Sequence, residues 1–403
     1  MQYTEYELGE LLPFEQPTAY IVKSTDYSDA YATPVLTAGK SFILGKTNET
    51  DGIFDQLPVI IFDDFTTATQ FVNFRFKVKS SAMKILHINT DLVIPKYIFY
   101  RLQIIQFDHS THKRYWIQSY SKIKVLIPPL DEQFRIVARI EEFFSELDKA
   151  VDTLKTTKEQ LVVYRQAILQ QAFIGNSNYH KRKSSIPKAE FKPVDAKELV
   201  RLASLPQEWK YVYLSDLGNL SRGKSSHRPR NDPKLFENGV YSFFQTGDVK
   251  GAQKDLYNCE KKYNDVGLAQ SKLWPAGTLC ITIAANIAET CFLGVDGCFP
   301  DSIVGFIPND NLVLKEYIRF FIEASKLKLW AYAPATAQKN INLSTLENLI
   351  VPYCGIEEQQ YIVQKIEEID SVCNKLEQTI DIALAQADAM RQSILKQAFE
   401  GKI

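Results

Sequence analysis

The sequence EQFRIVARIEE occupies residues 132–142, and a close copy, EQQYIVQKIEE, occupies residues 358–368. These copies belong to longer segments, 132–175 and 358–401, which align without a gap and are identical at 19 of 44 positions. In both segments apolar residues recur at alternating spacings of four and three, the heptad pattern of a coiled coil. Because a long internal repeat constrains the architecture before any local motif does, we expect two similar halves, each a globular module followed by a long helix.

Proline and glycine mark the expected ends of both helices. Pro128 and Pro129 precede the first segment and Pro352 precedes the second, where we expect them to end the incoming strands. Gly175 and Gly401 stand where a left-handed C-terminal cap favours glycine. Neither segment contains an internal proline or glycine. At 1.5 Å per residue, each helix should be roughly 65 Å long.

A heptad seam of this length has to be buried against a partner, and the simplest partner is the other helix, packed antiparallel. The predicted fold class is therefore α+β, with two globular domains of mixed sheets and short helices, separated by two long antiparallel coiled-coil helices with pseudo-two-fold symmetry. A plainer alternative is a coiled coil that only joins two domains or dimerises the protein. The expected divisions are a first domain at 1–126, a central helix at 127–176, a linker at 177–205, a second domain at 206–350 and a C-terminal helix at 351–403.

Composition indicates an ordinary globular protein, with 403 residues of which 45% are hydrophobic and 24% are charged. No apolar run reaches the ~18 residues of a membrane span, and the first residues do not resemble a signal peptide. All six cysteines lie in the second half without a CxxC pair. We interpret them as reduced thiols of a cytoplasmic protein rather than as a metal site or disulfides.

The charges are unevenly distributed along the chain, although the formal net charge is only −1. Residues 127–176 carry a net charge of −2 and residues 351–403 a net charge of −4, which leaves +5 for the rest. The basic modules are therefore the better surface for a polyanion, and the acidic helices are better suited to docking proteins.

Local patterns predict strands and short helices inside both modules. The predicted strands cover 57–62, 71–78 with a continuation at 80–86, 240–245 and 278–284, and the predicted helices cover 97–107 and 313–329. The two modules also share short similar segments at their ends. Residues 7–11 resemble residues 213–217, and residues 121–127 resemble residues 344–350. Between these segments the sequences of the two modules differ almost throughout, as expected for two binding modules with different ligands.

The segment GNLSRGKS at residues 218–225 matches the phosphate-loop pattern GxxxxGK[ST]. That motif requires a helix directly after it, whose N-terminus faces the phosphates. Here Pro229 and Pro233 follow, without an apolar period, so we do not expect a helix or nucleotide hydrolysis. We interpret the loop as a flexible basic arm that reaches phosphates or a guanine edge.

Three motifs together resemble a known family. They are PPLDEQFRIV at 128–137 with its repeat, LPQEW at 205–209, and AQKNI at 337–341. The chain resembles, over its whole length, the DNA-specificity subunit of type I restriction–modification enzymes. Two departures are a turn that is three residues longer before the second helix and a first module that lacks the LPxxW opening.

This resemblance implies that each module is a target-recognition domain for one half of an interrupted double-stranded DNA target. It further implies that the helices set the spacing between half-sites and dock two methyltransferase subunits, which bind S-adenosylmethionine. A restriction and translocase subunit that uses ATP and Mg would join them. No catalytic residue, cofactor or metal is expected in this chain. One DNA turn is roughly 34–36 Å, so such helices would place the modules up to about two turns apart.

Residue type and loop position select the candidate DNA contacts. They are Thr37, Lys40, Thr66, Thr67, Thr69, Gln70, His112, Lys113, Arg114 and Tyr115 in the first module, and Ser221, Arg222, Lys224, Ser225, His227, Arg228, Arg230, Gln245, Thr246, Asp248, Asn286, Gln338, Lys339 and Asn340 in the second. The candidates for partner docking on the helices are Glu132, Gln133, Arg165, Gln166, Glu358, Gln359, Arg391 and Gln392.

Signatures of catalysis are missing from the sequence. It contains neither the Asn-Pro-Pro-Tyr nor the Asp-Pro-Pro-Tyr element of adenine methyltransferases, no HExxH and no zinc spacing. Asp64 and Asp301 could be structural turn acids as easily as contacts. The alternative function is a coiled-coil scaffold that joins two modules for ligands other than DNA.

Overall fold

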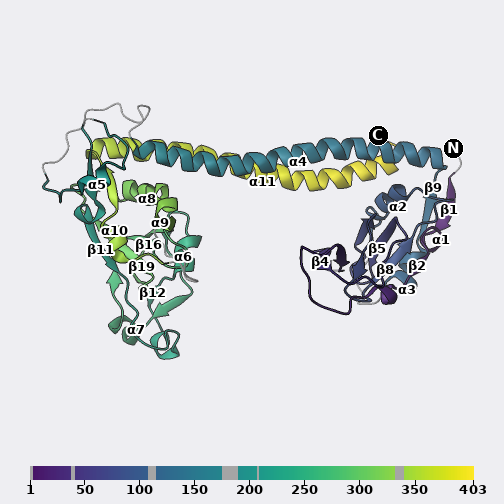
Figure 1. The fold of residues 1–403 in the computed structure, drawn as a ribbon, viewed down its shortest axis with the longest axis horizontal. Coiled ribbons are helices and arrows are strands. Elements are labelled where there is room, and N and C mark those ends of the chain that lie inside the picture. The colour runs from purple at the N-terminus through teal and green to yellow at the C-terminus, as the bar shows by residue number, and fades with distance from the viewer. Residues whose placement is uncertain (1–2, 38–40, 108–114, 175–188, 207, 332–339) are drawn as a thin grey trace. The chain divides into compact units, whose positions relative to one another are not determined.

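The computed structural model describes residues 3–37, 41–107, 115–174, 189–206, 208–331 and 340–403. Contacts divide the chain into two compact units (Figure 1). Unit 1 comprises Met1–Thr156 with Ile380–Ile403, and unit 2 comprises Thr157–Thr379. Each unit therefore contains one globular domain and a part of both long helices.

The repeated segments form the two long helices, α4 (Leu130–Phe173) and α11 (Ile356–Phe399), each of 44 residues. Both begin and end two residues earlier than the aligned repeat. Gly401 has a φ of 69°, and the amide of Lys402 donates to the carbonyl of Gln397 at 2.9 Å, so the predicted left-handed cap is confirmed there. Gly175 lies outside the described residues.

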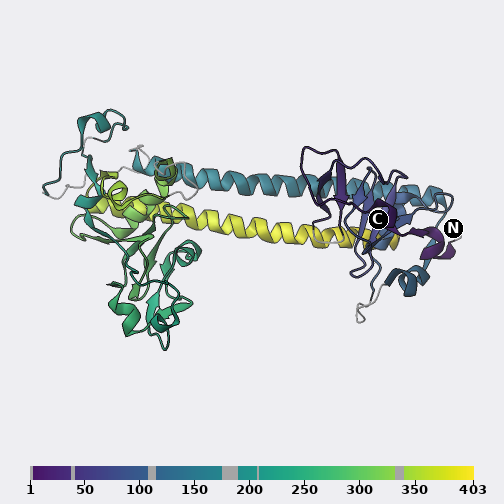
Figure 2. The same cartoon turned by 60° about the horizontal axis from the view of Figure 1, so that its bottom comes forward.

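In each unit the two helices run side by side and antiparallel (Figures 1 and 2). In unit 1, Ile140 of α4 packs with Leu395 and Ala398 of α11, and further along α4 Asp148 pairs with Arg391. In unit 2, Lys158 lies 3.9 Å from Glu377, and Arg165 pairs with Asp370. Within each unit, the residue numbers of the partners on α11 decrease as those on α4 increase, which confirms the predicted antiparallel packing.

The heptad seam is not buried along its whole length. Ile140 and Cys373 are buried as the pattern predicts, but Tyr164 is 52% exposed and Leu376 is 50% exposed. Packing of one helix on the other therefore leaves part of the predicted seam of unit 2 uncovered.

In its described residues the domain of unit 1 contains an antiparallel sheet, a smaller mixed sheet and a short strand pair. The pair is β1–β9, one sheet has the order β2-β8-β5-β6, and the other has the order β4-β3-β7. The strands are β1 (Thr4–Glu7), β2 (Phe14–Glu15), β3 (Thr33–Leu36), β4 (Ile43–Thr47), β5 (Val59–Asp63), β6 (Thr69–Val72), β7 (Lys77–Val78), β8 (Met83–His87) and β9 (Lys124–Ile127). The helices are α1 (Leu8–Leu11), α2 (Pro95–Leu102) and α3 (Tyr115–Gln118).

The domain of unit 2 has the same plan with extra strands. The pair is β10–β20, and the sheets have the orders β11-β19-β16-β17-β13 and β14-β12-β18-β15. The strands are β10 (Lys210–Tyr213), β11 (Gly218–Arg222), β12 (Tyr241–Phe243), β13 (Asp255–Leu256), β14 (Lys261–Tyr263), β15 (Leu273–Trp274), β16 (Leu279–Thr282), β17 (Thr290–Leu293), β18 (Gly297–Cys298), β19 (Ile303–Pro308) and β20 (Ile350–Tyr353). The helices are α5 (Ala196–Leu199), α6 (Thr246–Gly251), α7 (Asp265–Ala269), α8 (Lys315–Ala324), α9 (Lys326–Ala331) and α10 (Leu343–Glu347).

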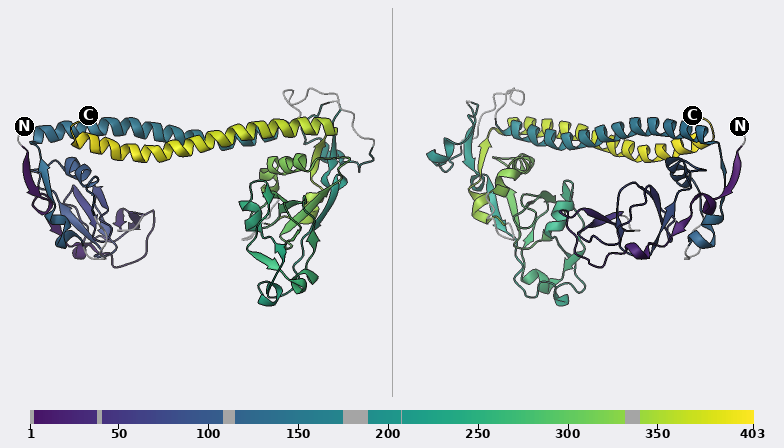
Figure 3. Two further views of the ribbon diagram at one scale, coloured as in Figure 1. Left: turned by 180° about the vertical axis from the view of Figure 1, so that it is seen from behind. Right: turned by 45° about the vertical axis from the view of Figure 1, so that its right-hand side comes forward.

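The topologies correspond strand by strand. In the larger sheets β2, β8, β5 and β6 match β11, β19, β16 and β17, with every pairing antiparallel in both domains. In the smaller sheets β3 pairs antiparallel with β4 and parallel with β7, as β12 does with β14 and β18. In each unit the domain lies along one side of its own part of the helix pair (Figure 3). The internal repeat therefore extends through the domains, although their sequences hardly agree.

Three local predictions were wrong in detail. Residues 71–78 do not form one strand, because β6 ends at Val72 and β7 begins at Lys77 in the other sheet. The predicted helix 313–329 is divided at Ser325 into α8 and α9. Pro352 does not end the strand before α11 but lies inside β20, opposite Tyr211. β20 belongs to a sheet of only two strands, where a missing N–H donor is tolerated.

The polar segment predicted as a linker is partly packed onto the second domain. The ring of Phe191 lies 5.1 Å from that of Tyr353, and the ammonium of Lys210 lies 4.1 Å from the Phe191 ring centre. Asp195 caps the short helix α5 by accepting from the amide of Lys197. The second half of the linker thus forms part of unit 2.

Candidate nucleic-acid interface

In each domain, one hairpin has a loop that is closed by a side chain. This side chain belongs to the last residue of the hairpin's first strand. Asp63 ends β5, and its carboxylate accepts from the Phe65 amide at 2.9 Å and from the Thr66 hydroxyl at 2.7 Å. Thr282 ends β16, and its hydroxyl accepts from the Glu289 amide at 3.0 Å and donates to the Asn286 carbonyl. Because β5–β6 and β16–β17 correspond, the predicted contacts Thr66, Thr67 and Asn286 lie in equivalent loops.

A second segment is joined to each of these hairpin loops. In the first domain the amide of Tyr115 donates to the carbonyl of Asp64 at 3.0 Å. In the second domain Asn340 forms a bridge with Ala284, and the amide of Ile341 donates to the carbonyl of Ile283 at 2.9 Å. The structure therefore brings Asn340 next to the loop that contains Asn286, across a long separation in sequence.

A third group of predicted DNA contacts lies in the loop after the central strand of each smaller sheet. Thr37 follows β3, and its amide donates to the carbonyl of Phe42 at 2.9 Å. Gln245, Thr246 and Asp248 follow β12 at the start of α6, where Gln245 and Asp248 form a reciprocal capping box. This capping occupies one side-chain oxygen of each residue but leaves Gln245 exposed.

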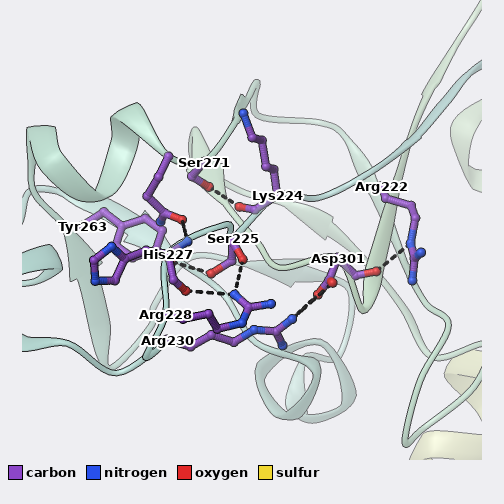
Figure 4. Close-up of polar contacts among 10 residues, drawn as sticks. Arg222, Lys224, Ser225, His227, Arg228, Arg230, Tyr263, Ser271 and Asp301 are labelled. Atoms are coloured by element: carbon purple, nitrogen blue, oxygen red, sulfur yellow. Dashed lines mark hydrogen bonds and ion pairs between the residues drawn. The ribbon is translucent and has the colours of Figure 1, made fainter.

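The basic segment after β11 is fixed by hydrogen bonds, so the prediction of a freely flexible arm was wrong (Figure 4). The amide of Lys224 donates to the carbonyl of Phe299 at 3.0 Å, and its own carbonyl accepts from the hydroxyl of Ser271 at 2.7 Å. One guanidinium nitrogen of Arg228 donates to the carbonyls of Ser225 and His227, both at 2.8 Å. As predicted, no helix follows Ser225 directly, so this loop does not have the geometry of a nucleotide phosphate site.

Asp301 organises two cations of this segment (Figure 4). Its carboxylate accepts from one nitrogen of Arg230 at 2.9 and 3.1 Å, and its backbone carbonyl accepts from Nε of Arg222 at 2.9 Å. His227 lies 2.9 Å from the carboxylate of Asp232, and this side-chain hydrogen bond is the main cause that lowers the pKa of Asp232. Asp301 and Asp232 therefore both shape the basic loop.

Lys224 and Lys272 are exposed residues on this surface. Among the described residues the ammonium of Lys224 has no hydrogen-bond or ion-pair partner. The ammonium of Lys272 lies 3.6 Å from the ring centre of Trp274 and donates to the hydroxyl of Ser221 at 2.8 Å. Sequence reasoning missed Lys272, because it is 51 positions from Ser221 and only the fold brings the two together. Partial burial also lowers the pKa of Lys272.

Two predicted contacts are buried in this structure and do not suit a role at a DNA surface. Ser225 is 5% exposed, and its hydroxyl lies 3.3 Å from that of Tyr263. Tyr115 is 4% exposed, and its ring packs on Phe107. Both residues were selected by type alone, which does not distinguish a polar core residue from a surface one.

The remaining candidates of the first domain differ in position. Gln70 is exposed on β6, whereas the hydroxyl of Thr69 accepts from the side-chain amide of Gln103 at 2.6 Å. In the second domain the equivalent Thr290 donates to Glu323 at 3.0 Å, and burial raises the pKa of that carboxyl group. Thr69 thus helps to hold the hairpin on α2. The predicted contacts Lys40, His112, Lys113, Arg114, Gln338 and Lys339 lie outside the described residues.

The helix glutamines predicted to dock partners instead bind their own domain. Gln133 is fully buried: it accepts from the amide of Ile94 at 2.8 Å and donates to the carbonyls of Leu92 and Pro128 at 3.0 and 2.9 Å. Ile94 is the N-cap residue of α2, so Gln133 fixes the start of that helix. This interpretation of Gln133 as a docking residue is therefore corrected, because its side chain is inaccessible.

Gln359 repeats this arrangement in unit 2. It accepts from the amide of Leu314 at 2.9 Å and donates to the carbonyls of Leu312 and Cys354 at 3.1 and 2.8 Å. Its neighbour Glu358 is only 5% exposed and is also inaccessible to a partner. The repeat therefore preserves these residues for attachment of each helix to its domain.

The other docking candidates divide into internal and exposed groups. Arg165 pairs with Asp370 and with Glu377, and Arg391 pairs with Asp148, so both hold the helices together. Gln166 donates to the carbonyl of Ala324 at 3.2 Å, again within its own unit. Gln392 is exposed, and Glu132 is half-buried beside Arg135.

Each unit has a groove along its helices. In unit 2 a groove of about 540 Å³ is lined by Leu161, Tyr164, Glu368, Ile369, Val372, Cys373 and Leu376. In unit 1 a groove of about 760 Å³ lies between α2, α4 and α11, and its lining includes Lys96, Tyr100, Glu141, Phe144, Arg391 and Gln392. The unit 2 groove is the more apolar of the two. Val162 and Val163 do not line it and are 65% and 70% exposed on another face of α4.

The described part of the chain has neither a metal site nor a membrane-spanning helix. No group of three or more His, Cys, Asp or Glu side chains could hold a metal ion there. Among these residues, no helix is both long and apolar enough to cross a membrane. The six cysteines are free thiols, five of them buried.

Comparison with known proteins decides which family has this arrangement. The specificity subunit of the type I restriction enzyme EcoR124I/EcoR124II from Escherichia coli is 31% identical over 92% of this chain and 87% of its own length. This chain belongs to the family of type I restriction–modification specificity subunits. The family description "type I restriction modification DNA specificity domain" matches residues 206–386, which include the second domain. The resemblance inferred from the sequence is thereby confirmed.

Two solved structures share the fold of this chain. The HsdS subunit from Thermoanaerobacter tengcongensis aligns with all of this chain and 97% of its own, with a TM-score of 0.54 at 17% identity. A chain from a study of complex assembly and conformational transition of the type I restriction–modification system aligns with all of this chain and 98% of its own, with a TM-score of 0.66 at 17% identity. These likenesses confirm the predicted fold class of two domains joined by coiled-coil helices.

Proposed function

We propose that this chain recognises a bipartite, interrupted DNA target, with one half-site bound by each domain. The observation that carries this proposal is the repetition of one framework with different side chains. Both domains present a side-chain-closed hairpin loop, a segment joined to it and the loop after a central strand. Thr66 and Thr67 occupy the hairpin loop of one domain, and Asn286 occupies that of the other. Equivalent frames with different donors and acceptors are suited to two different base sequences.

The basic segment of the second domain supports contact with the phosphate backbone. Lys224, Lys272 and Arg228 are exposed at one surface, while Asp301 and backbone carbonyls hold the surrounding loop in place. Phosphate contacts of this kind position a protein on the duplex, and base-edge contacts supply the sequence information. Lys272 thereby joins the candidate DNA contacts.

The helices would serve as the spacer and as the docking surface. The proposed partners are two methyltransferase subunits, which bind S-adenosylmethionine, and restriction subunits, which use ATP and Mg. This chain would then contribute no catalytic group of its own. Because Gln133, Gln359 and Glu358 are buried, docking would use exposed groups instead. The unit 2 groove is mostly apolar, and Tyr164 and Leu376 in its lining are half-exposed, which is typical of a protein interaction surface.

Co-expression of this chain with the methyltransferase encoded beside it tests the proposal. We expect a complex of two methyltransferases with one specificity subunit on size-exclusion chromatography. Sequencing of the host DNA should then detect methyladenine at one interrupted sequence. Soluble chains that form no complex and leave no methylation would contradict the proposal and favour a scaffold for ligands other than DNA.

Replacing both Lys224 and Lys272 by alanine should weaken DNA binding without changing the recognised sequence. Each lysine that contacts a phosphate releases bound counterions, so its loss should make the dependence of log K on log salt shallower by roughly one unit. The measurement is fluorescence anisotropy with duplex DNA over a range of salt concentrations. Lys375→Ala, an exposed lysine on α11, is the matched control. An unchanged slope in the double variant would remove both lysines from the interface.

A further inference from the structure

Phe65 is an exposed aromatic residue in the loop of the β5–β6 hairpin. Its side chain is 49% exposed, and among the described residues it has no aromatic ring partner. Single exposed apolar residues are common on proteins, so exposure alone carries little weight. The distinguishing feature of Phe65 is the fixed backbone that holds it.

The loop around Phe65 is closed by a set of short hydrogen bonds. The amide of Asp63 donates to the carbonyl of Ala68 at 2.8 Å, and the amide of Thr67 donates to the carbonyl of Asp63 at 2.9 Å. The carboxylate of Asp63 holds the amide of Phe65 itself at 2.9 Å. Thr67 has a φ of 58°, the left-handed conformation of a tight turn. The backbone of Phe65 is thus set before any ligand arrives.

The residue before Phe65 anchors the loop to the core. The carboxylate of Asp64 is buried, lies 3.2 Å from the ammonium of the fully buried Lys84 and accepts from the amide of Trp116 at 2.9 Å. The carbonyl of Asp64 accepts from the amide of Tyr115 at 3.0 Å. Because the backbone on both sides of Phe65 is fixed, binding through its exposed ring would cost little backbone entropy.

An aromatic ring held outward in this way has a specific use on nucleic acid. Every base has a π-face on which such a ring can stack, and apolar side chains can insert between base steps and open them. The neighbouring residues Thr66 and Thr67 were selected as base contacts without reference to Phe65. In the corresponding hairpin of the second domain the exposed loop residue is Ala285, which has no ring.

We propose that Phe65 stacks on a base or inserts at a base step of the half-site bound by the first domain, and so helps to determine its sequence. This inference rests on the proposed DNA-recognition function. Stacking strength and the ease of opening a step depend on base identity, so such a contact discriminates between sequences without hydrogen bonds to base edges. The contact would be particular to the first domain.

The experiment compares Phe65→Ala, Phe65→Trp and wild-type chains, each co-expressed with the methyltransferase, by sequencing methyladenine in host DNA. With alanine we expect one or two positions of a single half-site to become degenerate, or methylation at the wild-type target to fall roughly fivefold to a hundredfold. Tryptophan should retain most of the wild-type pattern, because it preserves the stacking surface. Tyr257→Ala removes a 59% exposed aromatic ring after β13, away from the long helices, and is the matched control that should leave the recognised sequence unchanged.

A direct binding measurement separates this inference from the function on which it rests. Purified full-length chains are titrated at low salt with mixed-sequence duplex DNA, and Phe65→Ala should bind more weakly than wild type. If wild type methylates or binds DNA and Phe65→Ala matches it in sequence, extent and affinity, the role of Phe65 is overturned while the proposed function stands. If wild type neither binds nor directs methylation, the proposed function fails and the inference fails with it.

Discussion

Asp64→Ala should destabilise unit 1 by about 3–5 kcal/mol, because it removes one partner of a buried ion pair and leaves the other charge uncompensated. Lys84 is fully buried, and its ammonium lies 3.2 Å from the Asp64 carboxylate. The same substitution removes the acceptor for the amide of Trp116. Urea denaturation, followed by hydrogen exchange at peptides containing Trp116, would measure the loss of stability in this unit.

Two further variants serve as controls for this prediction. Replacing both partners by apolar residues of similar size, Asp64→Leu with Lys84→Met, should recover part of the lost stability, since no unpaired charge remains although the Trp116 amide still lacks its acceptor. Asp91→Ala removes an exposed aspartate of the same unit and should change stability by no more than about 0.5 kcal/mol. A variant at Asp64 that unfolds at the same urea concentration as the Asp91 variant would show that the ion pair does not hold the hairpin.

Gln359→Ala should destabilise unit 2 by about 2–4 kcal/mol, because the buried Gln359 side chain makes three hydrogen bonds that are lost at once. The carbonyl of Cys354 would remain buried without this partner, and the part-buried amide of Leu314 and carbonyl of Leu312 would lose it as well. Gln359→Glu should be at least as harmful, since a carboxylate cannot donate to the two carbonyls and brings a buried charge. Thermal unfolding, with hydrogen exchange at the start of α8, would measure the effect.

The adjacent residue provides the control for Gln359. Gln360 is exposed on the same helix, so Gln360→Ala should leave stability almost unchanged. Gln133→Ala should repeat the effect of Gln359→Ala in unit 1, because the same three bonds occur there. A Gln359 variant with wild-type stability but weaker methyltransferase binding would instead restore the original interpretation of this residue as a docking contact.

The long helices could be predicted because their heptad pattern is local and occurs in both copies of the repeat. A heptad pattern without proline or glycine over 44 residues identifies a helix whatever surrounds it, and α4 and α11 end within two residues of the aligned repeat. The sheets could be predicted only as separate strands. Which strands pair is decided between distant residues, so the common topology of the two domains was not visible in their divergent sequences.

For the candidate DNA contacts, too, the sequence did not show what contacts between distant residues decide. Residue type selected Thr66, Asn286 and Lys224 as readily as Ser225 and Tyr115, although the last two are buried. It also passed over Lys272, which the fold brings into contact with Ser221 of β11 from 51 positions away. Whether a polar side chain faces solvent depends on the packing around it, and residue type does not record that packing.

The sequence by itself determined the repeat, the two long helices, the order of domain, helix, domain and helix, and the family to which these belong, because each rests on patterns within continuous segments. Only the tertiary structure decided that Gln133 and Gln359 hold each helix to its own domain rather than face a partner. It also decided that Asp64 anchors a hairpin which presents Phe65 outward. These roles depend on distances between residues far apart in the chain, and such distances exist only once the sheets have formed.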